Sequence, residues 1–185
     1  MAEIFHWAPA SIGENTENFS EIITISESGY EKRRTKASRS LMTCTFNYVN
    51  RQRAERYAIA AFLRARSGPH EWFWLPSFLW DSSVKTLYTT GTTLYVEDNS
   101  HFSEARSNGR YFIYIVNSSG QYETAYIAAT PGSDQLTLNA ALTYDYPVGS
   151  EVDICYRARL ADLNFAIDDL TYFVHNITLP FQEVK

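Results

Sequence analysis

Apolar and polar residues alternate along several short stretches of the chain, which is the pattern of half-buried β-strands. The clearest stretch, residues 41–49, places four apolar side chains on one face: Met42, Cys44, Phe46 and Tyr48. Residues 22–26 form a second candidate strand. Residues 172–181 alternate again, and we expect them to close the domain that the earlier strands begin. Strands should therefore dominate the fold.

One stretch instead has the three- and four-residue spacing of an amphipathic helix, at residues 51–66. Asn50 is a candidate N-cap, and Gly68 with Pro69 ends the helix. The expected buried stripe consists of Ala54, Tyr57, Ala58, Ala61, Phe62 and Ala65.

The rest of this helix offers a possible contact surface. Three arginines fall opposite the stripe, and two large aliphatic residues lie on a flank that one buried face does not need. We expect the subunit interface to include these five residues: Arg53, Arg56, Ile59, Leu63 and Arg64. A solvated basic helix face is the equally simple alternative.

From about residue 84 the pattern of apolar and polar residues changes to that of short strands separated by polar turns. The candidate strands are residues 86–88, 93–97, 111–116, 123–128, 135–138 and 151–157. With no helical pattern among them, a small antiparallel β-barrel (OB-like) or a sandwich closes the exposed edges most simply. We therefore predict an inserted barrel at 84–158 within a discontinuous domain of residues 1–83 and 159–185.

Composition fits a folded soluble protein, with 45% hydrophobic, 15% aromatic and 20% charged residues. The N-terminus lacks the pattern of a signal peptide, and no apolar run approaches the roughly 18 residues that cross a bilayer. We expect neither secretion by signal peptide nor a membrane partner. Cys44 and Cys155 form no CxxC pair, so they are expected to be small buried hydrophobes that suit assembly in a reducing cytoplasm.

The net charge of -5 hides a strong asymmetry along the chain. Residues 31–66 hold ten basic and two acidic residues, while the rest holds six basic and nineteen acidic ones. This pattern favours contact between unlike faces of neighbouring copies. A phosphate-binding patch is the competing interpretation, but the basic run lacks interleaved stacking aromatics and belongs to an acidic protein, so no specific nucleic acid is expected.

Few residues stand in patterns typical of catalytic or metal-binding sites. We therefore predict no catalytic residues, no bound metal and no cofactor. The four histidines stand alone, without metal-ligand spacing or a Ser-His-Asp order. Glu123 and Glu151 are the candidate carboxylates for a glycosidase, although both also fit as the solvent-facing members of their strands. Tyr144 and Tyr146, in a turn-like stretch, form the candidate platform for stacking on a sugar; packing of the turn against the barrel is the alternative.

The order of these signals resembles the lambda-type phage minor tail protein, or distal tail protein, family. The matching elements are Gly-Tyr-x-x-Arg at 29–33, Phe-Leu before a glycine at 62–68, Phe-Trp-Leu-Pro at 73–76 and Phe-x-x-Val at 181–184. The Arg-Ala-Arg-Ser-Gly stretch at 64–68 is also similar to uncharacterised phage and gene-transfer-agent tail proteins. The resemblance covers about residues 20–80 and 165–185; the shorter lambda-type members lack an insert like 84–160.

This resemblance implies a tail-tube-like β-sandwich with one packed α-helix, in a mainly β chain. It implies a structural, non-enzymatic part of the virion tail tip, assembled in the host cytoplasm as a homohexameric ring between the tail tube protein and the tail hub protein. The alternative is a carbohydrate-binding β-sandwich module that aids host attachment.

Overall fold

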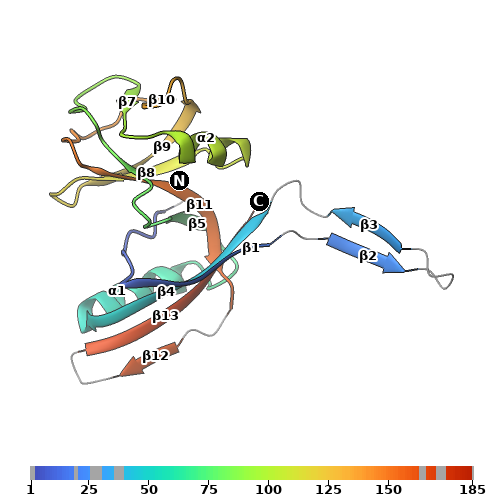
Figure 1. Cartoon of the computed structure of the whole chain (residues 1–185). Coiled ribbons are helices and arrows are strands. Elements are labelled where there is room, and N and C mark those ends of the chain that lie inside the picture. Colours follow the sequence, from blue (N-terminus) through green and yellow to red (C-terminus); the bar gives the residue numbers. More distant parts are fainter. Residues whose placement is uncertain are drawn as a thin grey trace. The chain divides into compact units, whose positions relative to one another are not determined.

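The computed structural model in Figure 1 describes residues 3–18, 21–25, 31–35, 40–162, 166–169 and 174–184. Thirteen strands and two helices lie within these residues, so the mainly β class is confirmed. The chain divides into two compact units. Unit 1 comprises Met1–Ala8 and Phe73–Arg157, and unit 2 comprises Pro9–Trp72 and Ala158–Lys185. None of the described helices is long and apolar enough to span a membrane.

Apart from β2 and β3, the described strands of unit 2 form one antiparallel sheet around β13 (Val174–Glu183). Strand β4 (Leu41–Gln52) pairs with one edge of β13, and β1 (Ser11–Asn18) pairs with the far edge of β4. The other edge of β13 is shared by β12 (Ala166–Asp169) and the end of β11 (Glu151–Leu160). One sheet covered by a helix thus replaces the two facing sheets of the expected sandwich.

The core of unit 2 lies on one face of this sheet. Met42, Cys44, Phe46 and Tyr48 are all buried, which confirms the alternation predicted for residues 41–49. Their partners on β13 are Ile177, Leu179 and Phe181, also buried, and the Phe46 and Phe181 rings meet edge to face with centroids 5.3 Å apart. Glu183 is buried as well, and its carboxylate accepts a 3.0 Å hydrogen bond from the backbone N–H of Met42, which offsets part of the cost of burying it.

Helix α1 (Arg53–Ala65) packs against β4 and β13, as Figure 1 shows. The predicted start is wrong: β4 runs directly into the helix, Gln52 occupies the N-cap position, and Asn50 lies within the strand. The predicted end is confirmed. The backbone N–H of Gly68, at φ 65°, donates to the carbonyl of Leu63, and a positive φ favours glycine.

The buried face of α1 is not the predicted one. Ile59, Ala60 and Leu63 are buried, whereas the predicted stripe is exposed except for the partly covered Phe62. Two branched aliphatic side chains remove more apolar area from water than a row of alanines does, and each full burial of such a side chain is worth about 1.5–3 kcal/mol. Spacing identified the helix, but side-chain size selected its inner face.

Strands β2 (Glu21–Ile25) and β3 (Glu31–Thr35) form a hairpin of their own. The two strands pair antiparallel over five residues each, from Glu21 with Thr35 to Ile25 with Glu31. Among the described residues, no other strand pairs with either of them. This hairpin is therefore a separate two-stranded sheet.

Unit 1 is built on the strand order β11-β8-β9-β10-β7. The strands are β7 (Thr93–Tyr95), β8 (Phe112–Val116), β9 (Tyr122–Ala129) and β10 (Gln135–Leu138), with short β5 (Phe73–Pro76) and β6 (Ser82–Ser83) against β11. The predicted closed barrel is wrong. Regular pairing ends at β7, and an isolated Val84–Val96 bridge links that edge to the segment carrying β6.

Two further predictions for this unit fail. Residues 86–88 are not a strand, since only Tyr88 forms an isolated bridge, to Tyr146. A helix that the sequence did not reveal, α2 (Ser100–Ser107), follows β7. It is only eight residues long and buries two apolar side chains, Phe102 and Ala105, so its sequence carries little periodic signal.

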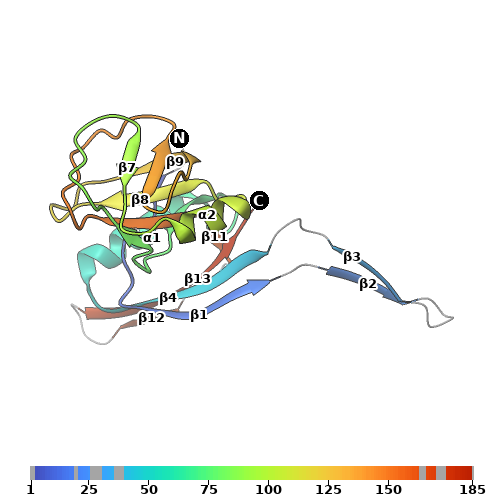
Figure 2. The ribbon, with the colours of Figure 1, turned by 45° about the horizontal axis from the view of Figure 1, so that its top comes forward.

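Figure 2 shows the ribbon of unit 1, whose sheet buries side chains on both of its faces. On one face, four buried side chains belong to the core of unit 1: Ile113, Ile115, Ile127 and Val152. The opposite face is covered by the N-terminal segment and β5: Trp74 packs on Phe112 with ring centroids 4.1 Å apart, and His6 stacks on Tyr122 at 4.9 Å. These contacts place residues 73–83 and Met1–Ala8 in unit 1, whereas the predicted insert begins at residue 84.

Candidate functional sites

The outward side of α1 is a small apolar surface bordered by arginines. Its centre is Tyr57, whose side chain is 50% exposed, among the exposed residues Ala54, Ala58, Ala61 and Ala65. We call these five residues the outer face of α1.

Arginines flank this face and hold its central ring. Arg53 donates to the Tyr57 hydroxyl from Nε at 3.3 Å and from Nη2 at 3.1 Å. The guanidinium carbons of Arg53 and Arg56 lie 5.4 and 5.9 Å from the Tyr57 ring centroid, and Arg64 is exposed nearby on the same helix. Ile59 and Leu63, predicted as the apolar part of the interface, are each 1% exposed and belong to the core, so that part of the prediction is wrong.

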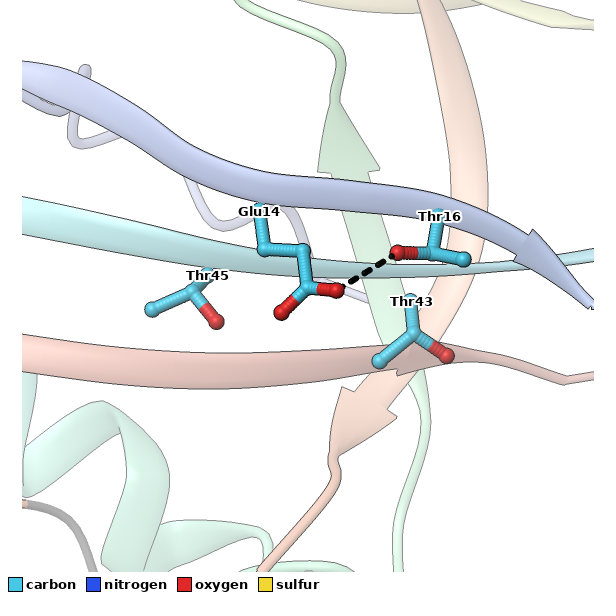
Figure 3. Close-up of a pocket in the computed structure, with 4 residues that line it drawn as sticks. All are labelled: Glu14, Thr16, Thr43 and Thr45. Atoms are coloured by element: carbon cyan, nitrogen blue, oxygen red, sulfur yellow. Dashed lines mark hydrogen bonds between the residues drawn. The ribbon is translucent and has the colours of Figure 1, made fainter.

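The face of the unit 2 sheet opposite the core is polar. Figure 3 shows a pocket of about 220 Å³ on this face, lined by Glu14 and Thr16 of β1 and by Thr43 and Thr45 of β4. Thr16 Oγ1 donates to Glu14 Oε1 at 3.3 Å. The hydroxyl and amide groups continue across the sheet, since Thr178 Oγ1 donates to Asn47 Oδ1 at 3.3 Å.

The two tyrosines proposed as a sugar platform have different environments. Tyr144 is 39% exposed, but Tyr146 is 0% exposed, so the prediction that it belongs to a surface platform is wrong. Its hydroxyl donates to Glu123 Oε1 at 3.0 Å, and burial is the main cause that raises its pKa. Packing of the turn, the alternative interpretation, describes Tyr146.

Glu123 organises this turn. Besides the Tyr146 hydroxyl, its carboxylate accepts hydrogen bonds from the backbone N–H groups of Thr143, at 2.9 Å, and Tyr144, at 3.2 Å. The strand register places Glu123 on the sheet face of Ile115 and Val152, and Glu151 on the opposite face with Val116 and Tyr122. The two candidate carboxylates therefore do not face a common substrate position.

A buried carboxylate cluster on β11 was not predicted from the sequence. Asp153 is 0% exposed, and its Oδ1 accepts the backbone N–H of Asp81 and contacts Ser77 Oγ, both at 3.2 Å. Asp81 Oδ2 accepts the Ser77 hydroxyl at 2.6 Å and the backbone N–H of Ile154 at 2.7 Å. One signal was present in the sequence: an acidic residue in the middle of the apolar run Val152-Asp153-Ile154.

The electrostatics of the cluster favour a neutral Asp153. Burial, followed by the nearby carboxylates of Glu151 and Asp81, raises its pKa to about 8. Its Oδ2 has no hydrogen-bond partner among the described residues. A neutral acid there avoids the cost of an unpaired buried charge.

The loop that this cluster holds, Ser77 to Asp81, is strained and apolar. Phe78 and Trp80 have φ values of 52° and 57°, in the left-handed region that non-glycine residues rarely adopt. Leu79 is 55% exposed and Trp80 is 64% exposed. The cluster therefore fixes an unfavourable backbone that presents two large apolar side chains.

Both cysteines are free and buried, as expected from their apolar contexts. Burial raises the pKa of Cys44 to about 12 and raises that of Cys155 as well. Within the described part of the chain, no group of three or more His, Cys, Asp or Glu side chains is arranged to hold a metal ion. Comparison with known proteins finds no family model and no curated protein that matches the chain.

Proposed function

We propose that the chain is a structural subunit of a bacteriophage tail tip, where copies form a ring that joins the tail tube to the central hub. The observation that carries this proposal is the separate β2–β3 hairpin. An isolated two-stranded hairpin is marginally stable in water, and open strand edges invite pairing with another chain. A neighbouring copy would supply the missing partner for the hairpin.

The charge distribution supports contact between unlike faces. Unit 1 contains four basic and ten acidic residues, while the basic segment 31–66 of unit 2 includes β3 and α1. A heterologous contact of this kind generates a ring when its rotation closes. The resemblance to the distal tail protein family implies six copies in that ring.

Apolar contact must supply most of the assembly free energy, because an exposed ion pair contributes only about 0–1 kcal/mol. The outer face of α1 is the surface that meets this need. Tyr57 combines a large half-exposed ring with a hydroxyl and two adjacent guanidinium groups, and aromatic residues and arginine are enriched at interface cores. In the proposed interface, the outer face of α1 takes the place of Ile59 and Leu63. Arg53, Arg56 and Arg64 remain part of that interface.

The polar face of the unit 2 sheet suits the lining of a channel through which DNA passes. Thr16, Thr43, Thr45 and Asn47 offer hydroxyl and amide groups, and Glu14 adds a negative charge. DNA affinity comes largely from Lys and Arg contacts with phosphates. A lining of this kind would let DNA pass without retaining it.

The solution assembly state tests this proposal. The purified chain should form closed rings, visible by negative-stain electron microscopy and with a single multimeric mass by light scattering. Tyr57→Asp should shift this mass to the monomer, whereas Leu87→Asp, at a 61% exposed position of unit 1, should leave the rings intact. A wild-type chain that stays monomeric at high concentration, or equal behaviour of the two variants, would count against the proposed interface.

Carbohydrate binding by unit 1 is the second candidate function. Tyr144 remains exposed, and Tyr111 and Tyr126 form an exposed stacked pair with ring centroids 5.5 Å apart. Aromatic faces of this kind can stack on sugars. Binding to host-surface glycans that is lost in Tyr144→Ala, by a chain that forms no ring, would favour this candidate.

A further inference from the structure

The Ser77–Asp81 loop depends on a single hydroxyl hydrogen. Ser77 Oγ lies 2.6 Å from Asp81 Oδ2 and 3.2 Å from Asp153 Oδ1, so it can donate fully to only one of these carboxyl groups. The shorter distance assigns that hydrogen to Asp81. The resulting bond joins the two ends of the strained loop.

Other bonds complete the frame but do not replace this one. The backbone N–H of Leu79 donates to Ser77 Oγ at 3.3 Å, and the backbone N–H of Ser77 donates to the carbonyl of Ile154 at 2.9 Å. Phe78 and Trp80 adopt their left-handed backbone between these anchors. Strained conformations of this kind persist only where the surroundings hold them in place.

We infer that the Ser77–Asp81 loop is a proton-dependent lock, in which neutral Asp153 leaves the Ser77 hydroxyl to Asp81 and ionised Asp153 takes that hydroxyl and releases the loop. Ionised Asp153 needs additional donors, because Oδ1 has the Asp81 N–H and Oδ2 has no partner among the described residues. The Ser77 hydroxyl, 3.2 Å from Asp153 Oδ1, is a donor that can turn toward it. The released loop relaxes from its strained backbone and changes how Leu79 and Trp80 are presented.

Two carboxyl groups, a phenol and a thiol surround Asp153. Asp81 and Glu151 face it with carboxylates, which raise its pKa. Tyr114 pairs with Asp153 from β8, and Cys155 follows it on β11; burial is the first cause that raises the pKa of each, so both stay protonated near neutral pH. The lock is therefore closed in mildly acidic solution and opens as pH rises through about 8.

The indole N–H signal of Trp80 reports the state of the loop. The chain has four tryptophans, so a ¹⁵N-labelled sample gives few indole signals, and Trp80→Phe identifies the relevant one. Across a pH series centred on about 8, the wild-type Trp80 signal should shift with a midpoint near that value. In Asp153→Asn, whose side-chain amide mimics the neutral acid, the signal should keep its low-pH position throughout.

The matched control is Asp134→Asn, which removes an exposed carboxylate of unit 1 that pairs with Lys85 at 2.8 Å. This variant should titrate like the wild type. Ser77→Ala removes the shared hydroxyl and should show the released signal even at low pH. A Trp80 signal that does not move in the wild-type protein, or that titrates equally in Asp153→Asn, would overturn the inference; the wild-type series decides the matter even if a variant does not fold.

Discussion

The free energy of unfolding should change with pH because of Asp153, and Asp153→Asn should remove that dependence. The pKa of Asp153 lies at about 8 in the folded chain, against an ordinary value of 3.8. Between these two values the folded state keeps a proton that the unfolded state loses. Stability is therefore fully present below about pH 4, falls as pH rises, and levels off once the folded group ionises near pH 8.

Each unit of pKa difference corresponds to about 1.4 kcal/mol, so ionisation of Asp153 should lower the free energy of unfolding by about 1.4 kcal/mol per pH unit between the two pKa values. Asp153 is fully buried, so solvent screens little of this effect. Asparagine has no carboxyl proton to lose, while its oxygen can still accept the Asp81 N–H.

Urea unfolding of the wild type and Asp153→Asn, measured at several pH values by circular dichroism, tests this prediction. The stability of the variant relative to the wild type should rise steadily from about pH 5 to about pH 8 and then remain constant. Asp134→Asn, the exposed control, should show no such trend. A difference between wild type and Asp153→Asn that is constant across the series would refute the reasoning.

Three further predictions follow from the packing. Leu63→Ala should destabilise the chain by about 2–5 kcal/mol in denaturant titrations because Leu63 lies in the core, whereas Ala61→Ser, on the outer face of α1, should change little. Glu123→Gln should cost about 1–3 kcal/mol, measured the same way, because it weakens the bonds that hold the 143–146 turn. Replacing an internal segment with a Gly-Ser linker should leave unit 2 folded by circular dichroism. The segment to replace is residues 73–157, and residues 1–8 are removed as well, because both belong to unit 1. The insert expected from the sequence was 84–158. An unfolded product would show that the two units share one core.

Local patterns were enough to predict some elements of the fold. Strict alternation identified the inner face of β4, and Gly68 marked the end of α1, because strand period and left-handed backbone are properties of a few adjacent residues. Spacing alone did not identify the inner face of α1. Counting apolar positions favoured the alanines, but burial favours the larger Ile59 and Leu63.

Features that depend on distant residues could not be predicted in this way. The burial of Tyr146 follows from its bond to Glu123, which lies on another strand. The backbone N–H of Asp81 meets the Asp153 carboxylate across 72 positions of sequence, and the register of β6 on β11 brings them together. An acidic residue inside an apolar strand signals a partner, but the sequence does not say which one.

Electron microscopy of phage tails assembled with this chain is the most direct test of the proposed function. We expect a closed ring of copies, coaxial with the tail, between the tube and the hub. Copies lying off the tail axis, or a chain that does not associate with the particle, would contradict the proposal and favour the carbohydrate-binding alternative.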